Sequence, residues 1–276
     1  MLGGTIVRRL VGNGEKVRTL VRDPSGAKRL EEAGAEIVWG DLKDPASLRD
    51  ACNGISTVIT TANSVARGGD DNVETVDLEG NRGLVEAALS WGVEHFIFVS
   101  VQGEDPESPL PFIRAKGLTS QLLRESGMAY TVLMPDHYMD IWFPLVILMP
   151  AAAGRPVTLA GEGTRKHYPV AVDDVAGYAV GAVRNDTAVD RDFLIGGPEP
   201  VSWRDVIAVY EDVKGVGLEI QSLQPGASMP GFPEGASGFM TMMETYDSPE
   251  PVSKTEAENI FGVRQTTVVE FLRQQV

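Results

Sequence analysis

The first half of the chain alternates short apolar runs, typical of strands, with segments typical of helices. The strand-like runs cover residues 16–21, 36–39, 57–60, 95–100 and 130–134. The helix-like segments cover residues 5–10, 27–33, 46–51, 73–90 and 113–126. Strands alternating with helices at this spacing imply right-handed crossovers and a parallel sheet covered on both faces. The run Phe96–Val99 is continuously apolar, as expected of a strand buried on both faces. The fold class predicted is therefore α/β.

The pattern loosens beyond Pro135. Short strands are predicted at residues 193–195 and 218–223, and helices at 173–184, 202–214, 254–261 and 266–275. Asp173 or Asp174 is a candidate cap for the first of these helices, and Ser202 for the second. Residues 224–236 are rich in Pro and Gly and are predicted to form an exposed loop. The sequence thus predicts a core domain over residues 1–150. A smaller α+β lobe over residues 151–276 would be interleaved with it.

The chain enters its first helix almost at once, and the first predicted strand follows that helix. This order is the second half of a dinucleotide-binding βαβ unit, which usually begins with a strand and a Gly-rich turn. In a doubly wound sheet that strand is central, so its absence would leave two strand edges unpaired. We therefore expect about ten further residues upstream in the native product. The alternative is that another segment of the chain fills the gap.

Composition narrows the classes of partner. Asp and Glu outnumber Lys and Arg by 39 to 24, giving a formal charge of -15, whereas nucleic-acid binding depends on Lys and Arg at phosphates. The longest apolar stretch, residues 141–153, holds two prolines and is too short to span a bilayer. No export signal opens the chain, so the expected location is cytoplasmic. The single cysteine, Cys52, excludes an internal disulfide and is predicted to be a small buried residue.

An ordered set of short motifs carries a family resemblance over residues 1–184. The pieces are Met1-Leu-Gly, Val21-Arg-Asp-Pro, Gly40-Asp-Leu, Phe98-Val-Ser-Val, Lys116, the run from Leu122 to Pro135, and Val170-Ala-Val-Asp-Asp-Val-Ala. Together they resemble an atypical short-chain dehydrogenase/reductase of the NmrA-like, NAD(P)H-binding kind. The resemblance implies a Rossmann-like doubly wound parallel sheet, here without its first strand, and a small C-terminal α+β lobe.

The resemblance also implies where the cofactor's adenosine half would bind. Leu2 and Gly3 correspond to the end of the phosphate-binding turn. Arg22 follows the second strand of such a unit, where an Arg accommodates a 2′-phosphate and an Asp or Glu would select NAD. NADP is therefore the expected cofactor, with NADPH preferred over NADH. Asp41 and Leu42 resemble the pair that contacts adenine. Asp41 could instead cap the next helix.

The nicotinamide half would meet residues at the ends of later strands. Thr61 and Ala62 end the next strand, where small residues let the backbone approach the cofactor. Ser100 stands where extended short-chain enzymes place their catalytic serine, and Lys116 resembles the lysine of the family's Tyr-x-x-x-Lys pair. Phe112 replaces that tyrosine, so the usual acid/base mechanism is unavailable. Lys116 could also be an exposed helical lysine.

Pro135, His137 and Tyr138 follow the sixth strand of the family's pattern, at the mouth of the expected nicotinamide pocket. His137 and Tyr138 are the only replacement proton donors that the sequence places there. His95 and His167 lie elsewhere in the sequence, and no His/Cys cluster has metal-ligand spacing, so no metal is expected.

Apolar clusters flank this presumed pocket, and they suit either a site for a flat acceptor or simply a core or a dimer surface. Their members are Met139, Trp142, Phe143, Met149, Phe239, Met240, Met242 and Met243. The leading interpretation is an NADP-dependent oxidoreductase that passes hydride to a small, quinone-like or azo acceptor. The alternative is a non-catalytic NAD(P)-binding protein that senses redox state. An epimerase is disfavoured by Phe112. A homodimer is left open.

Overall fold

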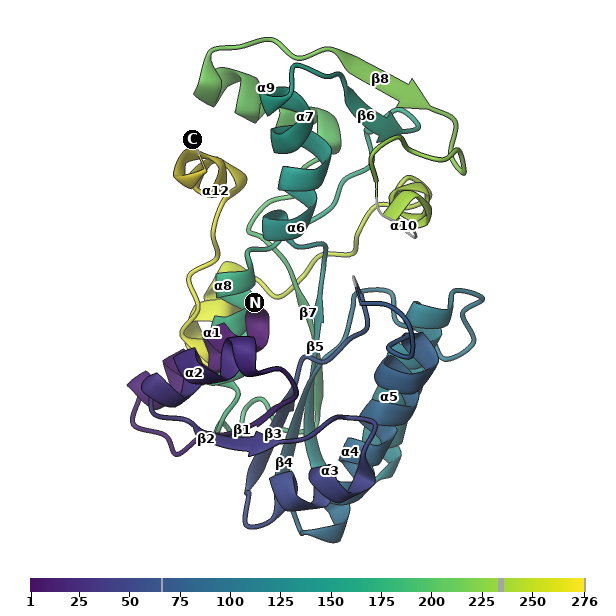
Figure 1. The fold of residues 1–276 in the computed structure, drawn as a ribbon. Helices are drawn as coiled ribbons and strands as arrows, with labels where there is room; N and C mark the ends of the chain where they lie inside the picture. The colour runs from purple at the N-terminus through teal and green to yellow at the C-terminus, as the bar shows by residue number, and fades with distance from the viewer. Residues whose placement is uncertain (66, 233–235, 276) are drawn as a thin grey trace. The chain divides into compact units, whose positions relative to one another are not determined.

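The computed structural model describes residues 1–65, 67–232 and 236–275, which divide into two compact units (Figure 1). Unit 1 comprises Met1–Pro135, Val175–Phe193 and Glu256–Val263. Unit 2 comprises Asp136–Asp174, Leu194–Thr255 and Arg264–Val276. Each unit is therefore assembled from three separate stretches of the chain.

The strands of unit 1 form parallel sheets, which confirms the predicted Rossmann-like α/β class. One sheet pairs β1 (Arg18–Val21) with β2 (Glu36–Trp39). The other has the order β3-β4-β5-β7, with bounds Thr57–Thr60, His95–Val99, Ala129–Pro135 and Arg191–Ile195. In the described part of the chain, β3 pairs only with β4 and β1 only with β2. Whether a further strand belongs beside them stays a prediction.

The register of the second sheet aligns the carboxyl ends of its strands. Thr60 lies opposite Phe98, and Val99 lies opposite Leu133. Phe96 and Ile97, which point to opposite faces of the strand, are both fully buried, and this confirms that β4 is covered on both faces. In open parallel sheets, ligands bind just outside this carboxyl edge. Residues that follow β3, β4 and β5 are therefore expected to line a ligand site.

Helices of unit 1 supply the apolar faces that bury this sheet. Their bounds are α1 Leu2–Gly12, α2 Pro24–Glu32, α3 Pro45–Cys52, η1 Val73–Leu78, α4 Glu79–Ser90 and α5 Pro111–Glu125, with η3 at Ala257–Phe261. Three elements run across the boundaries between the units: helix α8 (Val172–Gly181), the short α11 (Lys254–Glu256) and strand β7 (Arg191–Ile195). One buried cluster joins α3, α4 and α5 to β4 and β5 (Figure 1). Cys52 belongs to it, which confirms its predicted role as a buried residue.

Unit 2 contains a two-stranded parallel sheet and several short helices. The strands are β6 (Val157–Ala160) and β8 (Ile220–Leu223). The helical segments are α6 Met139–Phe143, η2 Pro144–Leu148, α7 Met149–Ala152, α9 Trp203–Lys214, α10 Ala236–Met243 and α12 Val268–Gln274. Among the described residues, no helix has both the length and the apolarity to cross a bilayer.

Polar side chains fix several helix starts. Asp23 caps α2 through Ser25 N, and Ser202 caps α9 as predicted. Asp44, not Asp41, caps α3, so the capping alternative for Asp41 is wrong. The prediction for Asp173 and Asp174 is also wrong, because α8 already begins at Val172. Its first amide, Val172 N, instead donates to the distant Asp140 Oδ2 at 2.8 Å.

Candidate active site

A buried lysine stands at the carboxyl edge of the unit 1 sheet. Lys116, on α5, is 2% exposed, and its ammonium donates to Ala62 O at 3.4 Å and to Val99 O at 3.3 Å. These carbonyls follow β3 and end β4. The structure therefore excludes the alternative that Lys116 is an exposed helical lysine. It brings Lys116 together with Ala62, as expected of a cofactor site.

Aromatic rings complete the surroundings of this amine. Lys116 Nζ lies 4.9 Å from the centre of the Phe98 ring and 5.6 Å from that of Phe112. Burial lowers the pKa of Lys116 to about 8, while the charges of Asp77 and Glu104 oppose that shift. A lysine in this state holds its proton at neutral pH, and its contacts given above are with backbone carbonyls and aromatic rings. It is suited to donate hydrogen bonds to a ligand's hydroxyl groups.

The first turn of α1 lies beside the end of β3. A Cβ placed on Gly3 would stand 3.3 Å from Thr61 Oγ1, so this approach needs glycine or a small shift of Thr61. Leu2 begins α1, and its first turn has no acidic side chain and no side-chain cap. Backbone amides at such a helix start favour anions. Gly3 and Thr61 are therefore brought together as the cofactor prediction requires.

Ser100 belongs to a polar network that the sequence did not reveal. Its hydroxyl donates to Glu104 Oε2, which also accepts from Ser120 Oγ at 2.6 Å. Arg124 Nη2 donates to Glu104 Oε1 at 3.0 Å and to Asp192 Oδ2 at 2.7 Å. The Ser100 proton is thus committed to a carboxylate. The signal missed was an acid four residues beyond a strand end, on the loop that leads to α5.

Gln102 is a second residue that the sequence did not reveal. Its backbone N–H donates to Pro135 O at 2.9 Å, which ties the loop after β4 to the end of β5. Its side chain is buried, and among the described residues Gln102 Nε2 has no hydrogen-bond partner. A buried amide donor without a partner is costly, and a ligand's carbonyl or carboxamide would satisfy it. No local sequence pattern distinguishes Gln102 from an exposed loop residue.

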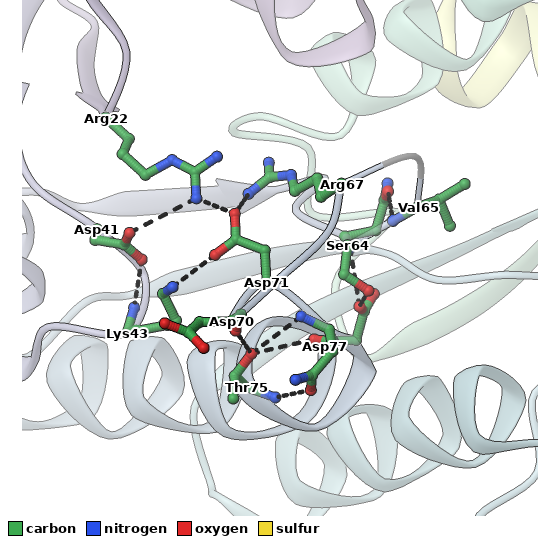
Figure 2. A network of polar contacts seen from close by, with 12 residues as sticks. Arg22, Asp41, Lys43, Ser64, Val65, Arg67, Asp70, Asp71, Thr75 and Asp77 are labelled. Atoms are coloured by element: carbon green, nitrogen blue, oxygen red, sulfur yellow. Dashed lines mark hydrogen bonds and ion pairs between the residues drawn. The ribbon is translucent and has the colours of Figure 1, made fainter.

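Arg22 lies at the end of β1 within a cluster of charges (Figure 2). Its guanidinium bonds Asp71 and lies 3.8 Å from Asp41. Asp71 also accepts from Lys43 Nζ at 2.6 Å and lies 3.6 Å from Arg67 Nη1. The hydrogen bonds from Arg22 and Lys43 lower the pKa of Asp71 to about 2 despite an opposing effect of burial. The structure therefore brings Arg22 close to Asp41, and the Arg22 guanidinium is already bonded to the Asp71 carboxylate.

The two residues predicted to contact adenine differ in their freedom to do so. Asp41 Oδ1 accepts from Lys43 N at 2.9 Å, which shapes the turn after β2. Leu42 packs against α4, where a Cβ on Gly80 would lie 2.8 Å from Leu42 Cδ2. Leu42 thus takes part in the unit 1 core, with only part of its surface available to a ring.

His137 and Tyr138 belong to unit 2, where His137 is buried and hydrogen-bonded and Tyr138 is half-buried. His137 is 6% exposed, and its Nδ1 lies 2.9 Å from Asp136 Oδ1. Burial raises the pKa of Tyr138 well above its ordinary value, which makes its hydroxyl a weaker acid. Their assignment as proton donors stays a prediction, and these environments do not favour it.

His137 also belongs to a buried group of side chains that sequence spacing could not reveal. Ligand atoms of Asp136, His137 and His167 lie within 4.8 Å of one another. Both ring nitrogens of His167 already have protein partners, Ser248 Oγ at 2.7 Å and Met243 O at 3.0 Å. Burial lowers the pKa of His167. The group is therefore a hydrogen-bonded core of unit 2.

The apolar residues flanking the predicted pocket mostly form the core of unit 2. Met139, Phe143, Met240 and Met243 are buried in one cluster. Trp142 and Phe239 pack against it with their rings stacked, centroids 4.6 Å apart. Met149 is exposed. The alternative of a simple core is confirmed for the four buried members.

Comparisons with known proteins identify the family of the chain. A family model described as NAD(P)H-binding matches residues 1–186. Photosystem II assembly factor Ycf39 of Cyanophora paradoxa is 32% identical over 220 residues, covering 79% of this chain and 67% of that protein. An NAD(P)H azoreductase of Xenophilus azovorans is 27% identical over 258 residues, covering 90% and 85%.

A solved structure extends the likeness to the whole chain. The NADPH-dependent quinone oxidoreductase QOR2 of Escherichia coli, complexed with NADPH, has a TM-score of 0.80 at 19% identity and covers 100% of this chain and 96% of that one. At this identity the likeness shows the fold. The family model spans well over half of the chain, and it confirms the NmrA-like resemblance drawn from the motifs. The chain belongs to the NAD(P)H-binding family that this model describes.

Proposed function

We propose that the protein is an NADPH-dependent oxidoreductase that passes hydride to a small quinone-like or azo acceptor. The observation that carries this proposal is the buried Lys116 between the carbonyls of Ala62 and Val99, with Phe112 one turn before it on α5. In this proposal Lys116 serves as the lysine of the short-chain pair, and Phe112 puts a phenyl ring where the phenolic acid would be. Such a site can hold a cofactor but has no acid of the usual kind.

The class of acceptor follows from the absence of a tyrosine acid at position 112. A bound nicotinamide supplies the hydride, which is two electrons and one proton. A quinone or azo group that receives it takes its second proton from water, so the protein need only orient the two reactants and exclude side reactions. A ketone needs a proton delivered as the hydride arrives, and neither Phe112 nor the committed Ser100 supplies one.

Five residues of unit 1 have roles in this proposal. Lys116 donates hydrogen bonds to the nicotinamide ribose hydroxyls. Gly3 and Thr61 admit the pyrophosphate beside the start of α1. Arg22 binds the 2′-phosphate, and this favours NADPH over NADH. Gln102 offers its unpartnered amide to the nicotinamide end.

The proposal is tested by mixing the purified protein with NADPH and a panel of quinones and azo dyes. We expect loss of NADPH absorbance that depends on both protein and acceptor. The matched assay with NADH should give lower kcat/KM values. Protein that binds NADPH but oxidises none of it with any acceptor would refute the reductase assignment.

Replacing Phe112 with Tyr should create weak ketone reduction. The new hydroxyl would stand one helical turn from Lys116, the spacing of the short-chain pair. We expect a gain of about tenfold, below the ~100-fold or more of a well-placed acid, because Ser100 remains bonded to Glu104. The measurement is NADPH oxidation with a ketone panel. Phe112→Leu is the control, and an equal rate in both variants would contradict the expected role of the hydroxyl.

A second function is favoured by the Ycf39 relative, which is named as an assembly factor. In this alternative the protein binds NAD(P) without turnover and signals redox state to a partner. Lys116 and Phe112 suit it equally, since binding needs no acid. The acceptor panel separates the two, because only the reductase consumes NADPH.

A further inference from the structure

Three cations of unit 1 converge on one carboxylate (Figure 2). Arg22 comes from the end of β1, Lys43 from the turn after β2, and Arg67 from the loop between β3 and η1. We call these three residues the cation cluster. All three contact Asp71, whose side chain is only 9% exposed, whereas their own side chains are 31–45% exposed. The carboxylate is thus the enclosed centre and the cations are its accessible rim.

The backbone that carries Asp71 is held in place from both sides. Asn72 and Thr75 form a capping box at the start of η1, and Thr75 Oγ1 donates to Asp70 O at 2.6 Å. At the other end of the loop, Asp77 Oδ2 accepts from Ser64 N at 2.9 Å and from Ser64 Oγ at 2.6 Å. The segment therefore presents Asp71 to the cations, and rotation of one side chain would release them.

The charges around Asp71 show which ligand could replace its carboxylate in the cation cluster. The cation cluster faces Asp71 and, 3.8 Å from Arg22, Asp41. Asp23 and Asp70 add weaker negative fields at Arg22 and Lys43. If Asp71 withdraws, two arginines and a lysine are left facing a single near carboxylate. Arg and Lys in this arrangement are the groups that bind a phosphomonoester.

We propose that Asp71 is an internal competitor for the cofactor's 2′-phosphate, so that this one side chain sets the preference between NADPH and NADH. The inference rests on the proposed function for the identity of the ligand. Lys43 and Arg67 join Arg22 as the residues that receive the phosphate once Asp71 turns away. NADH carries a hydroxyl at this position and leaves the Asp71 contacts in place.

A competitor of this kind lowers apparent affinity in a predictable way. The measured dissociation constant for NADPH equals the intrinsic constant divided by the fraction of molecules in which the cation cluster is free. Asp71→Asn keeps the shape of the side chain but removes the charge that holds the cations. We expect this variant to bind NADPH about 10-fold more tightly than wild type, with the affinity for NADH unchanged.

Asp70→Asn is the matched control. It removes one negative charge from the adjacent residue, and the Asp70 carboxylate makes none of the bonds to the cation cluster (Figure 2). If general electrostatics were the cause, both variants would tighten NADPH binding equally. The proposal expects a clearly smaller change for Asp70→Asn.

The experiment is fluorescence titration of wild type, Asp71→Asn and Asp70→Asn with NADPH and NADH. Adenosine 2′,5′-bisphosphate and adenosine 5′-monophosphate are titrated calorimetrically as probes without nicotinamide. Tighter binding of only the 2′-phosphorylated ligands to Asp71→Asn supports the proposal. Weaker binding, no change, or equal gains for both nucleotides would overturn it. Loss of NADH affinity in Asp71→Asn would also overturn it, since Asp71 would then bind the ribose.

These readouts are independent of catalysis. A protein that consumes no NADPH with any acceptor, yet gains 2′-phosphate affinity in Asp71→Asn, would refute the proposed reductase and keep this inference. A protein that oxidises NADPH with an acceptor, but whose Asp71→Asn variant gains no 2′-phosphate affinity, would support the proposed reductase and refute this inference.

Discussion

Replacing Lys116 with Met should weaken NADPH binding by about 100-fold, because two charge-assisted hydrogen bonds to ribose hydroxyls are lost. Methionine has similar length and fills the space between the Phe98 and Phe112 rings. Fluorescence titration with NADPH measures the change. Lys28→Met is the control, because Lys28 is an exposed lysine of α2 and its loss should leave binding unchanged. An unaltered dissociation constant for the Lys116 variant would contradict its role as a cofactor ligand.

The Lys116→Met substitution should also change how the free energy of unfolding depends on pH. The pKa of Lys116 is about 8 in the folded protein against an ordinary value of 10.5, so the unfolded chain binds more protons between these values. The free energy of unfolding of the wild type should therefore rise relative to Lys116→Met by about 3 kcal/mol as pH increases from 8 to 10.5. Below pH 8 the difference between the two proteins should be constant. Urea titrations across this range measure it, and a difference independent of pH would contradict a buried amine.

Replacing Asp136 with Asn should lower the free energy of unfolding by about 3 kcal/mol. The Asp136 carboxylate is buried in unit 2 and accepts from His137 N at 2.7 Å and from Tyr168 N at 2.8 Å, with His137 Nδ1 at 2.9 Å. An amide of the same shape offers one acceptor fewer and turns an N–H₂ group toward one of these donors. Urea denaturation measures the loss.

The pH dependence of this effect is also fixed. Burial would raise the pKa of Asp136, but the bonds from His137 and Tyr168 outweigh it and lower the pKa to about 2. The stabilisation is therefore complete above the ordinary value of 3.8 and is lost as pH falls toward 2. The wild type and Asp136→Asn should converge over that window. Asp212→Asn, an exposed site on α9, is the control and should change stability by less than about 0.5 kcal/mol. If Asp136→Asn lowered the free energy of unfolding by as little as this control, the result would contradict the buried hydrogen-bond network.

The fold of unit 1 was predictable because local pattern and tertiary environment agree there. The continuous apolar run of β4 and the Asp-Pro helix starts at residues 23–24 and 44–45 each have one dominant physical cause. Residues 139–152 were missed because Pro144 and Pro150 interrupt the run. In the structure α6, η2 and α7 follow one another directly, and each proline stands where the helix changes between α and π geometry. Strand β6 was missed as well, since its partner β8 is some sixty residues away and pairing decides so short a strand.

Some residues of the candidate site were predictable from the sequence, and others were not. Lys116 was predicted from the lysine of the family's Tyr-x-x-x-Lys pair, and Thr61 from its place at the end of a predicted strand. Asp71 and Glu104 were missed because they bind arginines distant in sequence, Arg22 and Arg124. Gln102 was missed because its distinguishing feature, a buried amide without a partner among the described residues, is visible only in the structure. The predicted loop at residues 224–236 includes residues 233–235, which lie outside the described part of the chain. Residues 224–232 are irregular as predicted.

The central claim, hydride transfer from NADPH at the Lys116 site, is tested most directly by single-turnover oxidation of NADPH deuterated at the transferred position. The protein is mixed with this cofactor and a quinone, and the rate is compared with that of ordinary NADPH. We predict oxidation of one NADPH per quinone reduced, slower for the deuterated cofactor, and lost in Lys116→Met at the same cofactor concentration. Absence of acceptor-dependent oxidation, or equal rates for wild type and Lys116→Met under these conditions, would contradict it.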